Sequence, residues 1–155
     1  MSSSFEFLSE SESETFAFGK QLGQAVKQPC LIFLNGTLGA GKTRLVQAVA
    51  AGLDIAPETV NSPTFTIMTP HTGRMILVHV DAYRINDLDE AEQLGLDDWI
   101  ADGCVMMIEW SERIARVLPD PDLVIDIEQL EKDQRSFSVN AKSSNGALLL
   151  EQFKS

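Results

Sequence analysis

The chain has 155 residues, of which 44% are apolar, and a formal net charge of −11. This length accommodates one domain with a substantial core and is too short for two. Because an acidic chain repels phosphate backbones, free-standing nucleic-acid binding is disfavoured, and a positively charged protein partner is the more natural expectation.

The N-terminus and the apolar segments give no sign of export or of membrane insertion. Residues 1–6 lack the cationic start and the long apolar stretch of a leader. No segment approaches the roughly 20 apolar residues of a membrane span. Cys30 and Cys104 both fall in apolar, strand-like runs, so we expect buried, reduced thiols and no zinc site. These features predict a cytoplasmic protein that does not contact a membrane.

The first part of the chain predicts a strand, a helix and a second strand. Residues 5–8 form a short apolar-rich strand, and Ser11-Glu12-Ser13-Glu14 is a capping-box pattern that opens a helix. Apolar residues at helical spacing continue from there, and Pro29 ends the element. The apolar run at residues 30–34 is typical of a buried strand.

Residues 36–43 read Gly-Thr-Leu-Gly-Ala-Gly-Lys-Thr, which is the G-x-x-x-x-G-K-T pattern of a phosphate-binding P-loop. The pattern follows the predicted strand and precedes a helix that is expected to run to about Gly52. In this arrangement backbone N–H groups surround a phosphate at a helix N-terminus. The pattern therefore predicts that Lys42 reaches the terminal phosphates and that the Thr43 hydroxyl binds Mg²⁺.

The middle of the chain predicts a loop, a hairpin and a helix. Residues 54–62 contain Pro57 and run into Asn61-Ser62-Pro63, so they read as a loop. Residues 64–69 and 75–80 are expected to be strands joined by a turn at His71-Thr72-Gly73. Residues 87–94 predict a short acidic helix that is closed by Gly95.

The last part of the chain completes an α/β pattern. Residues 104–108 predict a central strand buried on both faces, and residues 111–118 predict a short helix. Residues 123–127 and 137–141 alternate apolar and polar side chains and should pair as outer strands, before a short helix or tail at 148–153. The sum is one P-loop NTPase-like domain over residues 1–155, with a mixed, mostly parallel central sheet flanked by helices and with antiparallel outer strands.

Two carboxylates follow apolar strands at positions suited to a metal. Asp81 follows the strand at 75–80, and Glu109 follows the strand at 104–108. A carboxylate at the C-terminal end of a core strand can face Mg²⁺ or its water shell, although each acid could instead cap the next element. His79 is expected to pack or to make a local hydrogen bond rather than to act as a base.

The polar loop at residues 61–65 is a candidate switch. In P-loop proteins a loop at this place often senses the terminal phosphate by becoming ordered around it. Ser62 and Thr64 carry hydroxyls suited to that role.

Four motifs, in this order, resemble the bacterial TsaE (YjeE) family: GTLGAGKT at 36–43, SPTF at 62–65, HVDAYR at 79–84 and IEW at 108–110. Residues 93–99 and 118–121 are also similar to that family, so the resemblance covers nearly the whole chain. It implies a small P-loop ATPase that uses ATP and Mg²⁺ and is the accessory subunit in synthesis of the threonylcarbamoyladenosine modification of tRNA. It further implies a TsaB–TsaD heterodimer as partner, in which TsaD is the transferase. The resemblance also implies that the chain itself hydrolyses ATP weakly and thereby resets this complex, and that it contacts tRNA only indirectly, through the complex.

The resemblance also implies roles for individual residues. It places phosphate binding on the loop formed by Leu38, Gly39, Ala40, Gly41, Lys42, Thr43 and Arg44. Thr43 and Glu109 match Mg²⁺ ligands, and Asp81 matches an acid near the metal or the attacking water, so Lys42, Asp81 and Glu109 form the expected catalytic set. Glu12 and Thr15 are expected near the nucleotide. The expected switch and partner residues are Ser62, Thr64, Tyr83, Arg84 and Trp110.

Some of these assignments have alternatives. Trp110 could pack in the core, and Tyr83 and Arg84 could cover the sheet edge. Thr37 and Arg44 depart from the family pattern, which often has Asp and Thr there, and Arg44 could alter phosphate or partner contacts.

The sequence offers no secure arginine finger among Arg84, Arg113 and Arg116. Because P-loop NTPases without such a finger are slow, we expect poor activity of the chain alone. Two other functions stay open, a nucleotide-gated scaffold without hydrolysis and a small-molecule kinase. ATP is favoured over GTP because the chain has no Asn-Lys-x-Asp motif.

Overall fold

A computed structural model of the chain describes residues 3–37, 39–61 and 67–154. The elements follow in the order β1 (Ser4–Ser9), α1 (Glu12–Ala25), β2 (Cys30–Asn35), α2 (Lys42–Gly52), β3 (Met68–Thr72), β4 (Ile76–Asp81), α3 (Leu88–Glu92), α4 (Leu96–Asp102), β5 (Val105–Glu109), β6 (Leu123–Gln129), β7 (Arg135–Ala141) and α5 (Ser144–Lys154). Short 3₁₀ turns lie at Pro57–Thr59, Ser111–Arg113 and Ala115–Val117.

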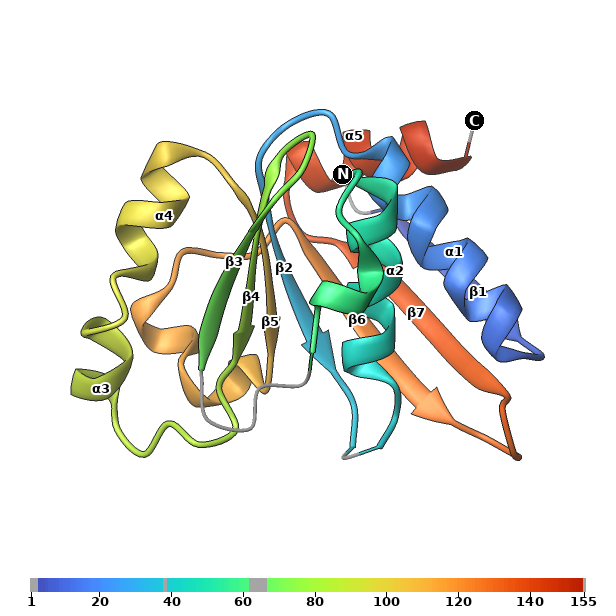
Figure 1. Ribbon diagram of the computed structural model, residues 1–155, viewed down its shortest axis with the longest axis horizontal. Helices are drawn as coiled ribbons and strands as arrows, with labels where there is room; N and C mark the ends of the chain where they lie inside the picture. The colour runs from blue at the N-terminus through green and yellow to red at the C-terminus, as the bar shows by residue number, and fades with distance from the viewer. Residues whose placement is uncertain (1–2, 38, 62–66, 155) are drawn as a thin grey trace.

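Within the described residues, seven strands form one mixed sheet in the order β1-β7-β6-β2-β5-β4-β3 (Figure 1). The four central strands β6, β2, β5 and β4 are parallel, and the pairs β1–β7, β7–β6 and β3–β4 are antiparallel. Helices α1, α2 and α5 cover one face, while α3, α4 and the turns after β5 cover the other. The predicted α/β class, with a parallel centre and flanking helices, is confirmed.

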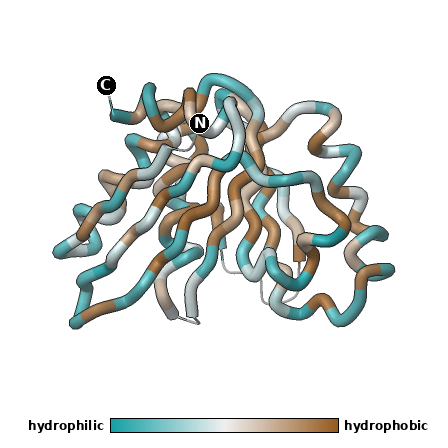
Figure 2. The backbone as a smooth tube through the Cα atoms, turned by 180° about the vertical axis from the view of Figure 1, so that it is seen from behind, coloured by the Kyte–Doolittle hydropathy of each residue, from teal (hydrophilic) through white to brown (hydrophobic). Residues whose placement is uncertain are grey.

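The continuous apolar runs explain why β2 and β5 occupy the centre. Ile32 and Leu34 of β2 pack towards α1 and α2, whereas Leu31 and Phe33 pack towards the opposite layer. Figure 2 shows that the hydrophobic residues gather in the strands and that the hydrophilic residues lie mostly in the surrounding loops. Because a centre strand is covered on both faces, both of its side-chain sets must be apolar.

Helix α1 begins where the capping pattern predicted. The Ser11 Oγ accepts a hydrogen bond from the Glu14 backbone N–H at 3.1 Å, and the Glu14 carboxylate accepts from the Glu10 N–H at 2.7 Å. These bonds give the backbone N–H groups of Glu14, in the first turn, and of Glu10, just before the helix, a hydrogen-bond partner that the helix itself does not supply.

The hairpin turn lies slightly later than predicted. Strand β3 continues through His71 and Thr72, and the chain reverses at residues 73–75. The cause is Arg74, whose backbone N–H donates to Leu53 O at 2.7 Å and whose guanidinium donates to the carbonyls of Gly23 and Val26, each at 2.8 Å. These bonds fix the turn against the ends of α1 and α2. Of the predicted strand at 64–69, residues 64–66 lie outside the described residues.

Three predictions for the second half of the chain are wrong. Residues 111–118 form two 3₁₀ turns rather than one helix, because Ile114, which lies between the turns, leaves helical geometry at φ −130°. The helix predicted at residues 87–94 ends at Glu92, with Gln93 as its C-cap, and Gly95, at φ 70°, instead precedes α4, which was not predicted. Strand β6 is not an outer strand, since it pairs parallel to β2.

The C-terminal helix is longer than predicted, and both cysteines are buried as the sequence predicted. Helix α5 starts at Ser144, earlier than the predicted residue 148. Cys30 and Cys104 are buried free thiols, as predicted, and burial raises their pKa values to about 12 and about 11. Within the described residues, none of the helices is both long and apolar enough to cross a bilayer.

Candidate functional site

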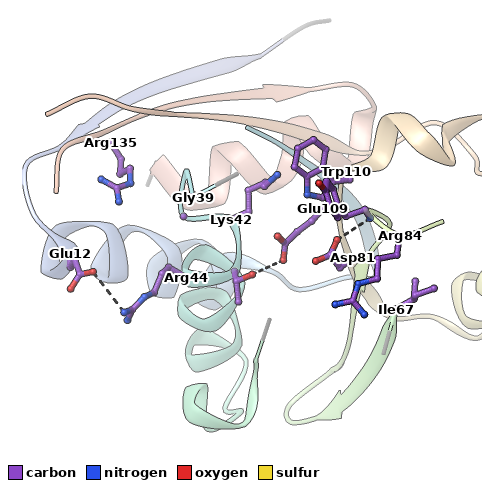
Figure 3. A pocket seen from close by; sticks show the side chains of 13 residues that line it. Glu12, Gly39, Lys42, Arg44, Ile67, Asp81, Arg84, Glu109, Trp110 and Arg135 are labelled. Atoms are coloured by element: carbon purple, nitrogen blue, oxygen red, sulfur yellow. Dashed lines mark hydrogen bonds and ion pairs between the residues drawn. The ribbon is translucent and has the colours of Figure 1, made fainter. Parts of the chain in front are cut away.

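A pocket of about 480 Å³ lies at the C-terminal ends of β2, β4 and β5 (Figure 3). Since parallel strands end at the same edge of a sheet, the loops that follow them meet there. The pocket brings together most of the predicted site residues, namely Glu12, Gly39, Gly41, Lys42, Thr43, Arg44, Asp81, Tyr83, Arg84, Glu109 and Trp110. Ala40 and Thr15 line an adjoining pocket instead. Leu38, Ser62 and Thr64 lie outside the described residues.

The glycine loop at residues 36–41 connects β2 to α2 through backbone angles that favour glycine. Gly39 has φ 84° and Gly41 has φ 104°, both in the left-handed region. Helix α2 begins at Lys42, directly after Gly41. The first N–H groups of a helix have no partner within it, and the helix dipole is positive there, so this end of α2 favours an anion.

Lys42 is held on the floor of the pocket. Its Nζ donates to Gly36 O at 2.8 Å and lies 3.7 Å from the centroid of the Trp110 ring. Burial lowers the pKa of the ammonium, and the negative charges of Glu109, Glu112 and Asp81 oppose that shift. A buried ammonium favours an opposite charge close by, and these three carboxylates supply part of that charge.

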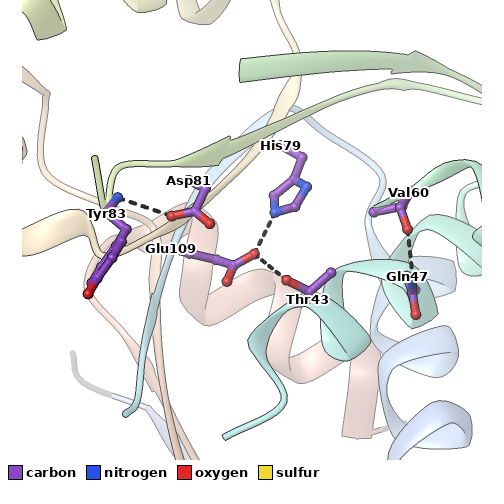
Figure 4. Close-up of polar contacts among 7 residues, drawn as sticks. All are labelled: Thr43, Gln47, Val60, His79, Asp81, Tyr83 and Glu109. Atoms are coloured by element: carbon purple, nitrogen blue, oxygen red, sulfur yellow. Dashed lines mark hydrogen bonds and ion pairs between the residues drawn. The ribbon is translucent and has the colours of Figure 1, made fainter. Parts of the chain in front are cut away.

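A buried polar network surrounds Glu109 at the end of β5 (Figure 4). Glu109 is 4% exposed, and its Oε2 accepts a hydrogen bond from the Thr43 hydroxyl at 2.9 Å. The same oxygen lies 2.6 Å from His79 Nε2. The predicted local hydrogen bond of His79 is therefore present, and its partner is Glu109.

Asp81 lies beside Glu109 because the two residues are opposite one another in the parallel register of β4 and β5. Its Oδ1 accepts a hydrogen bond from the Tyr83 N–H at 3.0 Å. Burial raises the pKa of the carboxyl, and the hydrogen bond from Tyr83 partly offsets that rise.

The oxygen donors at this edge fit Mg²⁺. Thr43 contributes a hydroxyl, and Asp81 and Glu109 contribute carboxylates, which are the hard ligands that Mg²⁺ accepts. Mg²⁺ usually combines one or two such carboxylates with waters and substrate phosphates rather than an all-protein cage. Among the described residues, no group of three or more His, Cys, Asp or Glu side chains is arranged to hold an ion.

A tilted aromatic pair forms one wall of the pocket. The rings of Tyr83 and Trp110 have centroids 5.0 Å apart, and the Arg113 guanidinium lies 5.4 Å from the Tyr83 centroid. Tyr83 is 46% exposed. This aromatic pair links the floor of the pocket, where Trp110 contacts Lys42, to the protein surface, where Tyr83 is exposed.

The adjoining pocket, of about 630 Å³, lies between the glycine loop and α1. Glu12 and Arg44 line both pockets and form an exposed ion pair at 3.9 Å. Thr15 is buried, and its hydroxyl is hydrogen-bonded to that of Ser9 at 2.6 Å. Of the two residues predicted near the nucleotide, Glu12 therefore lines both pockets and Thr15 lines only the adjoining one.

Sequence reasoning missed Arg135 and Ile67, which also line the first pocket. Arg135 Nε donates to Ala40 O at 2.9 Å, and its NH1 donates to Lys132 O at 3.0 Å. Arg135 opens an alternating strand far from the glycine loop in the sequence and carries no motif. Only the return of β7 alongside β6 brings it to the loop.

Comparison with known proteins identifies the family. The family model described as "Threonylcarbamoyl adenosine biosynthesis protein TsaE" matches residues 9–137. The chain is 37% identical over 140 residues to a tRNA threonylcarbamoyladenosine biosynthesis protein TsaE of Bacillus subtilis, with 90% of this chain and 87% of the relative covered. It is 34% identical over 132 residues to the protein of that name in Treponema pallidum, with 85% and 97% covered.

A solved structure agrees with this assignment. The crystal structure of Bacillus subtilis YdiB matches with a TM-score of 0.80 and 29% sequence identity, and the match covers 99% of this chain and 96% of that one. The chain belongs to the TsaE family, which is named for the biosynthesis of threonylcarbamoyladenosine in tRNA.

Proposed function

We propose that this member of the TsaE family is a cytoplasmic accessory ATPase of tRNA threonylcarbamoyladenosine biosynthesis. It binds ATP with Mg²⁺ in the glycine-loop pocket, hydrolyses the nucleotide slowly, and regulates or resets a TsaB–TsaD transferase complex. The protein is not itself the transferase, and tRNA reaches it only through that complex.

The observation that carries the proposal is the convergence of three features on one pocket. The glycine loop opens α2 and presents backbone N–H groups, Lys42 supplies a buried cation, and Thr43 is hydrogen-bonded to Glu109. Together they supply anion binding, charge neutralisation and hard oxygen ligands, which is what a nucleotide triphosphate with Mg²⁺ requires.

The pocket geometry suggests how the nucleotide lies. The phosphates occupy the glycine loop, where Lys42 exchanges its bond to Gly36 O for phosphate oxygens. The nucleoside extends into the adjoining pocket, past Arg135, where the half-exposed ring of Phe16 offers an apolar surface. Thr43, Asp81 and Glu109 hold the metal, which neutralises charge on the terminal phosphates.

Slow turnover by the chain alone follows from how the pocket arginines are engaged. Arg135 is bonded to backbone carbonyls, and Arg44 faces Glu12. An arginine that is free to stabilise the transferring phosphoryl group adds on the order of 10³ to 10⁵ in rate. We therefore expect acceleration when a partner supplies such a group or re-aims Arg84, which also lines the pocket.

Phosphate release from ATP, measured with the chain alone and with TsaB–TsaD added, tests the proposal. We expect slow release that the partners stimulate and that Glu109→Ala abolishes. Turnover at tens per second by the chain alone would contradict the accessory role. Bound ATP without phosphate release in either setting would favour a nucleotide-gated scaffold, and phosphate transfer to a metabolite would favour a kinase.

A further inference from the structure

His79 is a buried polar residue in an apolar strand. It is 1% exposed and interrupts a run of buried apolar residues in β4, formed by Leu77, Val78 and Val80. It lies opposite Met107 in the β4–β5 register, on the face of the sheet that α2 covers. Because a well-packed hydrophobic pair is often as stable as a buried polar pair, packing alone does not explain a histidine here.

The bond between His79 and Glu109 joins His79 Nε2 to Glu109 Oε2 at 2.6 Å. A carboxylate that binds Mg²⁺ is ionised and only accepts hydrogen bonds, so with the metal bound His79 Nε2 is the donor. The Thr43 hydroxyl donates to the same oxygen at 2.9 Å. Both donors take Oε2 and neither takes Oε1, so the carboxylate is fixed through one oxygen while the other is left for the pocket that Glu109 lines (Figure 4).

We propose that His79 is a positioning residue, which fixes the Glu109 carboxylate so that Oε1 is presented to Mg²⁺. This inference rests on the proposed function. Thr43 is itself expected to bind the metal. His79, on β4, is not an expected ligand and contacts only the Oε2 atom of Glu109. Such outer partners of metal ligands orient the ligand, and their loss typically weakens metal binding or activity by about 10- to 100-fold.

The experiment measures the gain in ATP affinity that Mg²⁺ provides, as the ratio of dissociation constants in EDTA and in Mg²⁺ by isothermal titration calorimetry. His79→Gln keeps an amide nitrogen near the place of Nε2, whereas His79→Asn is too short to reach Oε2. We expect His79→Asn to reduce the Mg²⁺-dependent gain by about 10- to 100-fold, with affinity in EDTA unchanged. We expect His79→Gln to retain most of the gain.

Two further measurements separate positioning from general destabilisation. Leu77→Ala removes a buried neighbour on the same strand and face, so it should lower the melting temperature while the Mg²⁺-dependent gain stays unchanged. Binding of Mn²⁺ in the presence of ATP, followed by electron paramagnetic resonance, should weaken in His79→Asn and not in Leu77→Ala.

The outcomes distinguish the two proposals. If the wild type shows no Mg²⁺-dependent gain, the proposed function fails. If the wild type shows the gain and His79→Asn retains it, the positioning role is overturned while the proposed function stands. An equal loss in His79→Gln and His79→Asn would also overturn it, because the lost property would not be the hydrogen bond to Oε2.

Discussion

The two faces of the sheet are built differently. On one face, α1 and α2 pack so closely that a Cβ on Gly52 would lie 2.2 Å from Lys20 O, and Arg74 ties the hairpin to the ends of both helices. On the other face, α3 and α4 are short, and Gly95 lies in the turn between them, where a Cβ would meet nothing within 4 Å. Helix α2 carries the first residues after the glycine loop, so the closely packed face is the one that supports phosphate binding.

The largest effect should come from adding a methyl group between α1 and α2. Gly52→Ala places its Cβ against backbone atoms that cannot move independently, so we expect it to destabilise the fold by about 3 kcal/mol. Gly95→Ala is the matched control on the other face, where only the left-handed φ of 70° is strained, at about 1 kcal/mol. Urea denaturation measures both. Equal costs would contradict the difference between the faces.

Arg74→Ala tests the connection between the hairpin and the two helices. The substitution removes charged hydrogen bonds to Gly23 O and Val26 O, and we expect a loss of about 2 kcal/mol in the free energy of unfolding. Arg116→Ala changes an exposed arginine near α3 and α4 and should stay within about 0.5 kcal/mol of the wild type. A similar small effect for Arg74→Ala would show that the turn does not depend on these bonds.

The smallest effect is a pH dependence on the α2 face. His71 is opposite Leu77, so their side chains share that face, and His71 Nε2 is buried without a hydrogen-bond partner in the described structure. Burial, with a smaller contribution from His79, lowers the pKa of His71 below its ordinary 6.5. The unfolded chain then binds the proton more readily, so stability is full above about pH 6.5 and falls as the pH drops towards the lowered pKa.

His71→Gln removes this titration. Chemical denaturation at pH 7.5 and pH 5.5 should show a smaller loss of stability on acidification in the variant than in the wild type. An identical loss in both would mean that another group accounts for the acid sensitivity.

Local patterns and parallel topology made much of the site predictable. The strand, glycine loop and helix at residues 30–52 are specified by neighbouring residues. Asp81 and Glu109 could be expected to meet because each ends a parallel core strand, and parallel strands end at the same edge.

The remaining features depend on contacts between distant residues. Arg135 reaches Ala40 O only through the pairing of β6 with β7, and the hairpin turn is set by carbonyls at the ends of α1 and α2. The non-helical backbone of Ile114, which interrupts the helix predicted at residues 111–118, has no signal in the residue type. That both contacts of the Glu109 carboxylate fall on Oε2 likewise could not be predicted, because it depends on where the side chains of Thr43 and His79 lie.

Calorimetric titration of ATP with Mg²⁺ into the wild type and Lys42→Ala tests the central claim that the glycine-loop pocket binds nucleotide. A charged hydrogen bond contributes roughly 1.5–3 kcal/mol, so the variant should bind roughly 10- to 150-fold more weakly. Lys27→Ala, which removes an exposed lysine outside the pocket, should bind as the wild type does. Undiminished binding by Lys42→Ala would contradict the account, because the nucleotide would then not depend on the cation at the centre of the pocket.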